Sequence, residues 1–303
     1  MQVKKVELCA HGPKLSKLVA GSMNWGIWGA DYKPVELARL VDSCFRIGIT
    51  TLDVADIYGH YTTEALVGAA LAELGVDREQ YQLVGKCGIK LVTPNRPEHK
   101  LKSYDSSKAH IIKSVEQSLK DLQAEYLDVL LIHRPDPLLD ADEVAEAFTA
   151  LRDVGKVNYF GVSNFSSSQF DMLNDRFPLV TNQVQCSPLH TDSIFDGTFD
   201  YLLKSKVKPM VWGPLGGGQY FQGGTTGVLR LRTAVKEISE KHGGVGEDVV
   251  LLSWLLRHPA RPLPILGSTK TDRLLRARLA LELELSREDW FEILEAAKGK
   301  EVA

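Results

Sequence analysis

The sequence predicts one (β/α)8 barrel that occupies residues 1–303 as a single domain. Short apolar or β-branched runs alternate with helical patterns almost from end to end, eight of them can be assigned as strands, and no Pro-, Gly- or Ser-rich linker divides the chain. A length of 303 residues alone suggests about two domains of ~150 residues, but a closed barrel of this class routinely uses ~250. An open, doubly wound sheet is the structural alternative, and its usual G-x-G-x-x-G after the first strand is missing.

The predicted barrel strands are mostly continuous apolar runs, and this pattern is typical of a parallel sheet that is covered on both faces. Before them, residues 3–8 and 14–18 flank the turn sequence A-H-G-P, which predicts a β-hairpin that closes the bottom of the barrel. The eight strands are predicted at residues 18–21, 49–53, 81–86, 127–133, 157–162, 181–186, 207–212 and 263–266.

Amphipathic stretches between the strands predict the helices. In residues 35–47, the apolar side chains of Leu37, Leu40, Val41 and Cys44 recur at three-and-four spacing, which marks one buried helix face. Glycines at positions 48, 75 and 155 follow such stretches and indicate helix ends. The predicted helices are residues 35–47, 63–74, 107–122, 142–154, 167–177 and 195–205.

Additional helices are predicted beyond the regular alternation. Two segments, 226–241 and 246–257, follow the seventh strand where one helix is expected. A C-terminal helix at 286–298 opens with S-R-E-D, which has the spacing of a capping box.

The composition excludes several classes of protein. Lys and Arg number 36 and Asp and Glu number 39, a formal net charge of −3 that gives no support to a nucleic-acid-binding surface. The N-terminus lacks the apolar core of a secretory signal, and no apolar run reaches the ~20 residues of a membrane helix. The four cysteines lie far apart, without the spacing of a disulfide framework or a metal site. We therefore expect a cytoplasmic protein with no nucleic-acid, membrane or metal partner.

Polar residues interrupt three consecutive strands at their carboxyl ends. The second strand ends at Asp53 with Tyr58 in the following loop, the third ends at Lys86, and the fourth ends at His133. The carboxyl ends of barrel strands form one mouth, so these four side chains are predicted to meet there. Each has an ordinary alternative, such as a turn-forming Asp or a packed Tyr, but four such coincidences at adjacent strand ends favour a reactive site.

This set has a specific chemistry. A phenol normally titrates near ~10, and a neighbouring ammonium group lowers that value. Asp53 would pair with Lys86 and offset its desolvation, while His133 would orient a substrate oxygen. Tyr58 is then placed to protonate an oxygen that gains negative charge, as a carbonyl oxygen does when hydride arrives at its carbon.

The motifs that carry these residues resemble the aldo-keto reductase family. They are T-T-L-D-V-A-D-I-Y-G-H-Y, L-V-G-K-C and L-L-I-H-R-P-D, and H-R-P-D-P is similar to an oxidoreductase branch found widely in bacteria. The resemblance covers essentially the whole chain. It implies that Asp53, Tyr58, Lys86 and His133 form the catalytic tetrad, with Tyr58 as general acid in the NADPH-dependent reduction of an aldehyde or ketone.

The resemblance also implies a site for the nicotinamide half of NADPH. Ser163 and Asn164 in S-N-F and Gln183 in T-N-Q would hydrogen-bond the carboxamide, and the ring of Trp212 would stack on the nicotinamide. Trp212 begins the segment W-G-P-L-G-G-G, whose glycines let backbone amides approach an anion closely. Gly213 and Leu215 in this segment are predicted to contact the cofactor.

A second cofactor segment follows strand eight. G-S-T-K-T-D-R resembles the family's site for the 2′-phosphate of NADPH, with Thr269 and Arg273 as the principal contacts beside Gly267 and Ser268. The sequence departs from the family just downstream, where Arg276 and Ala277 stand in place of the Glu and Asn that often hold the adenine. The extra arginine is expected to add to phosphate affinity.

Two other functions are open to such a barrel. A non-catalytic barrel that keeps NADPH as a sensing ligand, like the channel β subunits that resemble this family, would need a partner surface that the sequence does not indicate. An aldolase-type barrel would use Lys86 to form a Schiff base. The complete tetrad with the S-N-F and G-S-T-K segments favours the reductase over both.

The substrate side is less defined by the sequence. Trp25 is predicted to bind substrate together with His133, and Trp28 and Tyr61 could complete an aromatic pocket, although all three aromatics could equally anchor their loops. The expected partner is a small carbonyl compound of unspecified identity, bound by a monomer or weak oligomer.

Overall fold

The barrel strands close into one ring. A computed structural model describes residues 2–302. The barrel strands follow the order β10-β11-β12-β3-β4-β5-β8-β9, and each strand is parallel to both of its neighbours. All eight predicted strands are present, so the (β/α)8 barrel is confirmed for the described residues, outside which Met1 and Ala303 lie. The strands are β3 (Val19–Gly21), β4 (Thr51–Asp53), β5 (Gln82–Cys87), β8 (Leu127–Ile132), β9 (Val157–Ser163), β10 (Asn182–Gln185), β11 (Met210–Trp212) and β12 (Leu263–Leu266).

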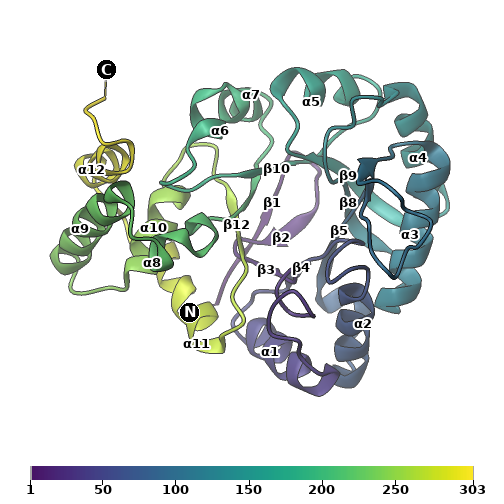
Figure 1. Cartoon of the computed structure of the whole chain (residues 1–303), viewed down its shortest axis with the longest axis horizontal. Helices are drawn as coiled ribbons and strands as arrows, with labels where there is room; N and C mark the ends of the chain where they lie inside the picture. Colours follow the sequence, from purple (N-terminus) through teal and green to yellow (C-terminus); the bar gives the residue numbers. More distant parts are fainter. Residues whose placement is uncertain (1, 303) are drawn as a thin grey trace.

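The helices surround these strands (Figure 1). The first five are α1 (Pro34–Arg46), α2 (Thr63–Leu74), α3 (Lys108–Leu122), α4 (Ala141–Asp153) and α5 (Ser167–Asn174). The predicted helix at 195–205 is instead two short ones, α6 (Asp192–Phe195) and α7 (Thr198–Lys204). The break lies at Gly197, which has a φ of +89°, a left-handed conformation that glycine adopts without strain. The Asp196 carboxylate accepts a hydrogen bond from the Thr198 amide and so caps the start of α7.

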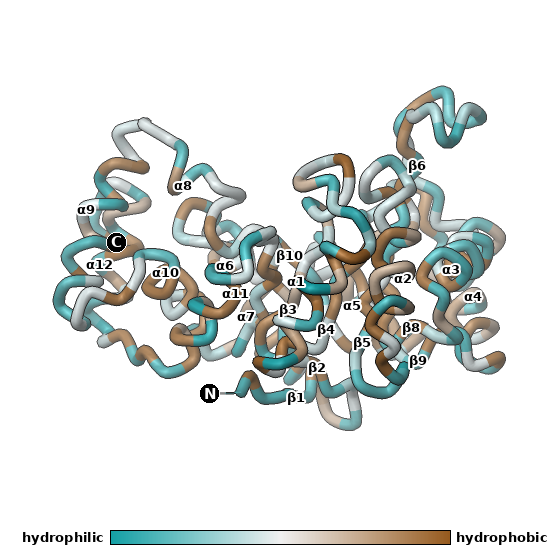
Figure 2. Tube along the Cα trace, turned by 90° about the horizontal axis from the view of Figure 1, so that it is seen from below, coloured by the Kyte–Doolittle hydropathy of each residue, from teal (hydrophilic) through white to brown (hydrophobic). Residues whose placement is uncertain are grey.

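The N-terminal hairpin closes one end of the barrel, as predicted. β1 (Lys5–Glu7) pairs antiparallel with β2 (Lys14–Ser16). Leu8 and Leu15, beside and within these strands, have no exposed surface and share one apolar cluster with Val84 of β5 and Met210 of β11. In Figure 2 the hairpin lies at the bottom of the view and β6 (Ile89–Lys90) at the top. The opposite end is therefore the one left for a functional site.

The C-terminal third carries the additional helices. α9 (Thr226–Lys241), α10 (Glu247–Leu256) and α12 (Arg287–Lys298) pack at one side of the barrel, in a second apolar cluster that also includes Val184 of β10 and Val211 of β11. Within it, the rings of Trp254 and Trp290 stack at 4.9 Å, and each indole nitrogen donates to the other residue's carbonyl oxygen at 3.0 Å. The predicted capping box is present, because Ser286 Oγ accepts from the Asp289 amide.

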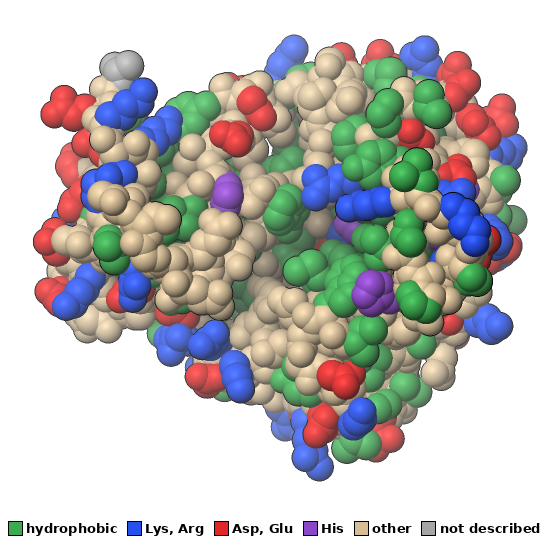
Figure 3. All heavy atoms as spheres, viewed as in Figure 1, with side chains coloured by type: hydrophobic (Ala, Val, Ile, Leu, Met, Phe, Trp, Pro, Cys, Tyr) green, Lys and Arg blue, Asp and Glu red, His purple; other side chains and the backbone are tan. Residues whose placement is uncertain are grey.

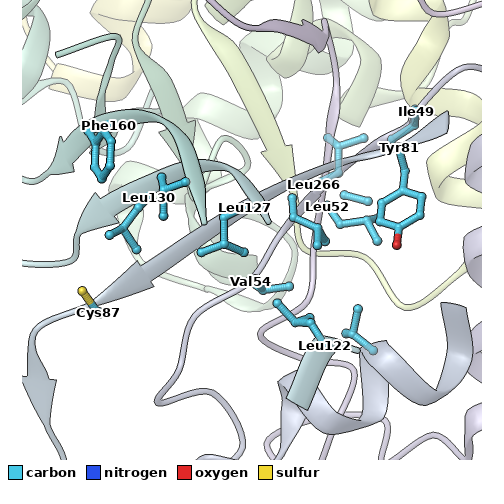
Figure 4. Close-up of a cluster of buried hydrophobic side chains, with 14 of the residues drawn as sticks. Ile49, Leu52, Val54, Tyr81, Cys87, Leu122, Leu127, Leu130, Phe160 and Leu266 are labelled. Carbon is cyan, nitrogen blue, oxygen red and sulfur yellow. The ribbon is translucent and has the colours of Figure 1, made fainter. Parts of the chain in front are cut away.

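The main core lies between the strands and the surrounding helices. Figure 4 shows part of it, where side chains from β4, β5 and β8 meet those of α3. The ring of Phe160 on β9 stacks on Phe148 of α4 at 4.3 Å. This packing holds the strand ends in fixed positions, which a site assembled from several strands requires.

Several elements were not predicted. β6 pairs with β7 (Ser103–Tyr104) in a small hairpin that follows β5. The other additions are η1 (Arg78–Gln80), η2 (Gly216–Gly218), α8 (Gln219–Gln222) and η3 (Arg278–Leu281), whereas α11 (Thr271–Ala277) is the helix expected to begin in the segment G-S-T-K-T-D-R. Most of these elements are too short to produce a periodic apolar pattern. Among residues 2–302, no helix has the length and apolar character needed to cross a membrane.

Candidate active site

The four predicted tetrad residues meet at the open end of the barrel. Asp53 ends β4, Lys86 lies near the end of β5, and His133 directly follows β8, and these strands are neighbours in the ring. Lys86 Nζ lies 2.5 Å from Asp53 Oδ1 and 3.1 Å from Tyr58 Oη. Its third hydrogen bond goes to the Val54 carbonyl oxygen at 2.8 Å. The ammonium group thus links the carboxylate to the phenol.

This ion pair is buried. The exposed fractions of Lys86 and Asp53 are 1% and 2%, so either charge alone would be costly to bury. The second carboxylate oxygen, Asp53 Oδ2, accepts from Gln183 Nε2 at 2.7 Å. Gln183 is predicted to bind the nicotinamide carboxamide, and the bond to Asp53 uses one hydrogen of its side-chain NH2 group and leaves the amide oxygen as an acceptor.

The electrostatics of the site keep Tyr58 protonated. Burial raises the pKa of Tyr58, and the positive charges of Lys86 and Arg134 lower it without reversing the rise. The expected net lowering of this pKa is therefore not found, and the phenol holds its proton at neutral pH. For Lys86, burial alone would lower the pKa, but Asp53 and Tyr58 raise it above its usual value and keep the ammonium charged.

His133 is a neutral imidazole at neutral pH. Burial and the nearby charges of Lys86 and Arg134 hold the pKa of His133 well below its usual range. Its ring meets the ring of Tyr58 edge-on at 6.0 Å, and its buried Nδ1 has no hydrogen-bond partner among residues 2–302. A neutral imidazole beside the phenol is suited to hydrogen-bond a substrate oxygen.

The predicted nicotinamide residues form a network beside the tetrad. Asn164, held at a φ of +63°, donates from Nδ2 to Ser163 Oγ at 2.8 Å and to the His133 carbonyl oxygen at 3.3 Å. Its Oδ1 accepts from the indole nitrogen of Trp212 at 3.0 Å. The half-buried ring of Trp212 is thereby fixed next to short polar groups, an arrangement that fits a planar aromatic amide.

The glycine-rich segment after β11 adopts backbone that other residues would strain to reach. Gly213 has a φ of +63°, and the three residues of η2 all have positive φ. Leu215 between them packs against the apolar core. Gly213 and Leu215 therefore lie beside Trp212, and their contact with a cofactor stays a prediction.

A pocket of about 590 Å³ lies between the β3–α1 loop and the segment after β12. Tyr32 donates its hydroxyl hydrogen to the Thr269 carbonyl oxygen, and Asn24 Nδ2 donates to the Gly267 carbonyl oxygen at 3.5 Å. Figure 3 shows the hollow at the barrel mouth, with Lys and Arg side chains along its rim. The pocket is lined by Asn24, Gly29, Ala30, Tyr32, Gly267, Ser268, Thr269, Lys270 and Arg273. The four residues predicted for the 2′-phosphate end of NADPH, at positions 267, 268, 269 and 273, are all among these lining residues. The positive charges of Lys270 and Arg273 suit a phosphate.

Arg276 does not join this pocket. Its Nε lies 2.9 Å from Asp248 Oδ2 on α10, and that ion pair uses the charge that was expected to add to phosphate affinity. The expectation was wrong because the sequence does not show that α11 places this side chain against α10.

The predicted aromatic pocket is corrected by the structure. Trp25 has no exposed surface and packs in the main core, so it anchors its loop and offers no surface to a substrate. Tyr61 is also an anchor, since its hydroxyl bonds the backbone of Ile89 and Leu91. Trp28 is 36% exposed, and its ring centroid lies 6.1 Å from that of Tyr58. Trp28 is therefore the aromatic that borders the tetrad.

Three ionisable residues whose charges influence the site or one another were not predicted. The Arg134 guanidinium lies over the Trp212 ring, with its carbon 5.6 Å from the ring centroid. Burial raises the pKa of Asp56 to about 7 and that of Glu64 to about 8, and the charge of Asp56 adds to the rise for Glu64. Arg134 and Asp56 lie within the recognised motifs H-R-P-D and L-D-V-A-D, and Glu64 is a carboxyl on a mostly apolar helix, a signal that could have identified it.

The geometry agrees with a family comparison over nearly the whole chain. The model of the Aldo/keto reductase family matches residues 17–298. The chain belongs to the aldo/keto reductase family. An uncharacterized oxidoreductase of Bacillus subtilis is 43% identical over 302 residues, with 99% of this chain and 100% of that protein covered. A 6-dehydroglucose reductase of Agrobacterium fabrum is 41% identical over 293 residues, with 95% and 97% covered.

Other aldo/keto reductase relatives are more distant. A putative voltage-gated potassium channel β subunit of Schizosaccharomyces pombe is 28% identical, with 89% of this chain and 86% of that protein covered. Among solved structures, a thermostable aldo-keto reductase crystallised with the inhibitor epalrestat superposes with a TM-score of 0.80 at 26% identity, covering 96% of this chain and 99% of that one. The chain is thus a family oxidoreductase, and the family acts on small carbonyl compounds with NAD(P)H.

Proposed function

We propose that this aldo/keto reductase reduces an aldehyde or ketone to an alcohol with NADPH, acting as one domain in the cytoplasm. The observation that supports this most directly is the position of Lys86 Nζ between Asp53 Oδ1 and Tyr58 Oη. It places one polarised O–H group at the barrel mouth, next to a neutral imidazole.

The residues divide the work of a carbonyl reduction. When bound, NADPH supplies hydride to the carbonyl carbon and leaves as NADP⁺. His133 holds the carbonyl oxygen, and Tyr58 gives its hydroxyl proton to that oxygen as negative charge develops. Lys86 stabilises the phenolate that remains until solvent returns a proton, and Asp53 keeps Lys86 in position.

The residues around Trp212 and the pocket after β12 fit the two ends of the cofactor. Trp212 and Asn164 provide a flat ring and an amide for the nicotinamide end. Lys270 and Arg273 provide positive charge for a 2′-phosphate, which supports NADPH over NADH. The Agrobacterium relative is named a 6-dehydroglucose reductase, and this name favours a polar, oxygenated carbonyl compound as the substrate.

The alternative functions receive less support. A Schiff base would need an uncharged Lys86 with a free nitrogen, but its three hydrogen bonds and raised pKa hold it as an ammonium ion. A sensing barrel would not need a complete tetrad, and the channel subunit is a more distant relative than the reductases.

The test is NADPH oxidation with propanal and glyceraldehyde by the full chain and by Tyr58→Phe. We expect turnover by the wild type and a loss of about 100- to 10,000-fold in Tyr58→Phe, the usual contribution of a general acid. NADPH binding, measured by protein fluorescence, should change less than about threefold because Tyr58 faces the carbonyl and not the phosphates. Equal turnover by the two proteins would remove Tyr58 from the mechanism, and no turnover by the wild type would favour a sensing role.

A further inference from the structure

Arg134 is the one cation at the tetrad whose charge is not used within the described chain. It follows His133 directly, where the backbone leaves β8, and its side chain is half-buried. Its guanidinium carbon lies 5.6 Å from the ring centroid of Trp212, close enough for a cation–π contact that holds the planar group at the mouth.

The carboxylates near Arg134 are occupied by other donors. Asp136 Oδ2 accepts from the amide and the hydroxyl of Ser106, and its Oδ1 accepts from the Leu138 amide. Asp53 is shared between Lys86 and Gln183. Across residues 2–302, no carboxylate oxygen lies within 4.0 Å of the Arg134 guanidinium.

The charge of Arg134 acts on the reacting groups. It contributes to the lowering of the His133 pKa and opposes the rise of the Tyr58 pKa. Since Lys86 is balanced by Asp53 and His133 is neutral, Arg134 supplies the net positive charge at the place where the substrate carbonyl would lie. The Arg134 guanidinium has five N–H donors, and we expect acceptor oxygens of a ligand to bind those that face the barrel mouth.

We propose that Arg134 binds acceptor oxygens of the substrate, either hydroxyl or carboxylate, carried close to the carbonyl group. The proposal rests on the reductase function and specifies its substrate class. His133 and Tyr58 bind the carbonyl oxygen, and the neighbouring Arg134 binds a second oxygen of the same molecule. The two faces of the Trp212 indole allow it to support the guanidinium on one side and a nicotinamide on the other. Apolar aldehydes leave the Arg134 donors unpaired and are poorer substrates.

The test compares three short aldehydes that differ in their acceptor oxygens. Propanal has none beside the carbonyl oxygen, glyceraldehyde adds hydroxyls, and glyoxylate adds a carboxylate. The wild type should prefer one or both oxygenated aldehydes over propanal. In Arg134→Met, kcat/KM for the preferred aldehyde should fall by about 10- to 100-fold more than kcat/KM for propanal, mostly through KM. Comparing this ratio cancels any effect of Arg134 on Tyr58, because that effect is common to every substrate.

Two further variants separate charge, fork geometry and general damage. Arg134→Lys keeps the charge without the planar fork, so it should recover more of the glyoxylate preference than of the glyceraldehyde preference. Arg96→Met is the matched control, because Arg96 also covers an aromatic ring, that of Tyr61 at 4.6 Å, outside the tetrad. It should leave all three substrate ratios unchanged.

A binding measurement keeps the test independent of turnover. Glycerate carries both kinds of oxygen and no aldehyde, and its binding to the NADP⁺ complex can be followed by calorimetry. We expect Arg134→Met to weaken glycerate binding at least tenfold and Arg96→Met to leave it unchanged. Equal glycerate binding by the wild type and Arg134→Met, or an unchanged ratio between oxygenated and apolar aldehydes, would overturn the proposal. A wild type that binds glycerate through Arg134 but turns over no aldehyde would overturn the reductase function alone.

Discussion

Gln183 on β10 donates its side-chain amide hydrogen across the barrel to Oδ2 of Asp53 on β4, over 2.7 Å. Three strands separate these two in the ring, so the bond crosses the barrel interior. It connects a residue of the predicted nicotinamide site to the carboxylate that holds Lys86. The two halves of the site are therefore joined by the protein itself.

Removing this bond should cost stability. In Gln183→Met, Asp53 Oδ2 stays buried and loses its donor, which is expected to lower the free energy of unfolding by about 1–3 kcal/mol. Chemical denaturation at neutral pH measures the change. Gln185→Met, two residues along the same strand and half-buried, is the matched control and should change stability by less than about 0.5 kcal/mol. Identical midpoints for the wild type and Gln183→Met would show that the bond contributes nothing.

The Lys86–Asp53 pair allows stability and catalysis to be separated. Lys86→Met leaves a buried carboxylate uncompensated, so we expect a loss of about 3–5 kcal/mol in unfolding free energy and a large drop in kcat. Adding Asp53→Asn to Lys86→Met removes that charge and should restore most of the stability. Activity should stay low in the double variant, because Tyr58 has lost the ammonium that favours its phenolate. Recovery of both properties together would contradict the assigned role of Lys86.

Glu64 should make stability fall as pH rises. Burial raises the pKa of this carboxyl to about 8, so the folded protein keeps a proton that the unfolded chain releases near ~4.3. A group whose pKa is raised on folding contributes stability below its unfolded pKa and loses it as pH rises toward the folded pKa. Glu64→Gln stays neutral throughout. The difference in unfolding free energy between Glu64→Gln and the wild type should therefore shift in favour of the variant by about 3 kcal/mol between pH 5 and pH 8. A difference that does not depend on pH would mean that Glu64 is already ionised in the folded state.

Two arginines close in sequence should behave differently toward the cofactor. Arg273 lines the pocket, whereas Arg276 is paired with Asp248. Arg273→Met should raise KM for NADPH by about 10-fold or more and leave KM for NADH nearly unchanged, since only NADPH carries the 2′-phosphate. Arg276→Met should lower the free energy of unfolding, because it breaks the ion pair with Asp248, and it should leave the ratio of the NADPH and NADH KM values nearly unchanged. If Arg276→Met gave the larger change in NADPH KM, the phosphate site would have to be moved.

The sequence predicts what depends on local pattern and topology, and less of what depends on distances across the fold. The strands, and the meeting of Asp53, Lys86 and His133 at one rim, follow from apolar runs and from barrel geometry. The bond from Gln183 to Asp53 does not, because the partner of a side chain inside a barrel is set by the ring as a whole.

Neighbouring residues of the same type show the same limit. Trp25 and Trp28 lie three positions apart, yet one is a core residue and the other borders Tyr58. Arg273 and Arg276 are equally close and divide between a pocket and an ion pair. Composition cannot separate them, because the direction of each side chain is decided by the loop or helix that carries it.

The β3–α1 loop touches both ends of the site. Trp28 in this loop lies against Tyr58, and Tyr32, four residues on, donates to the Thr269 carbonyl oxygen beside the pocket after β12. A ligand that immobilises one end of so short a segment removes conformational entropy that the other end would otherwise still have to lose. A nucleotide phosphate bound in that pocket would then order the aromatic side of the loop next to Tyr58 without any change of fold. The expected signature is positive coupling, in which the nucleotide and the carbonyl compound each lower the dissociation constant of the other by the same factor.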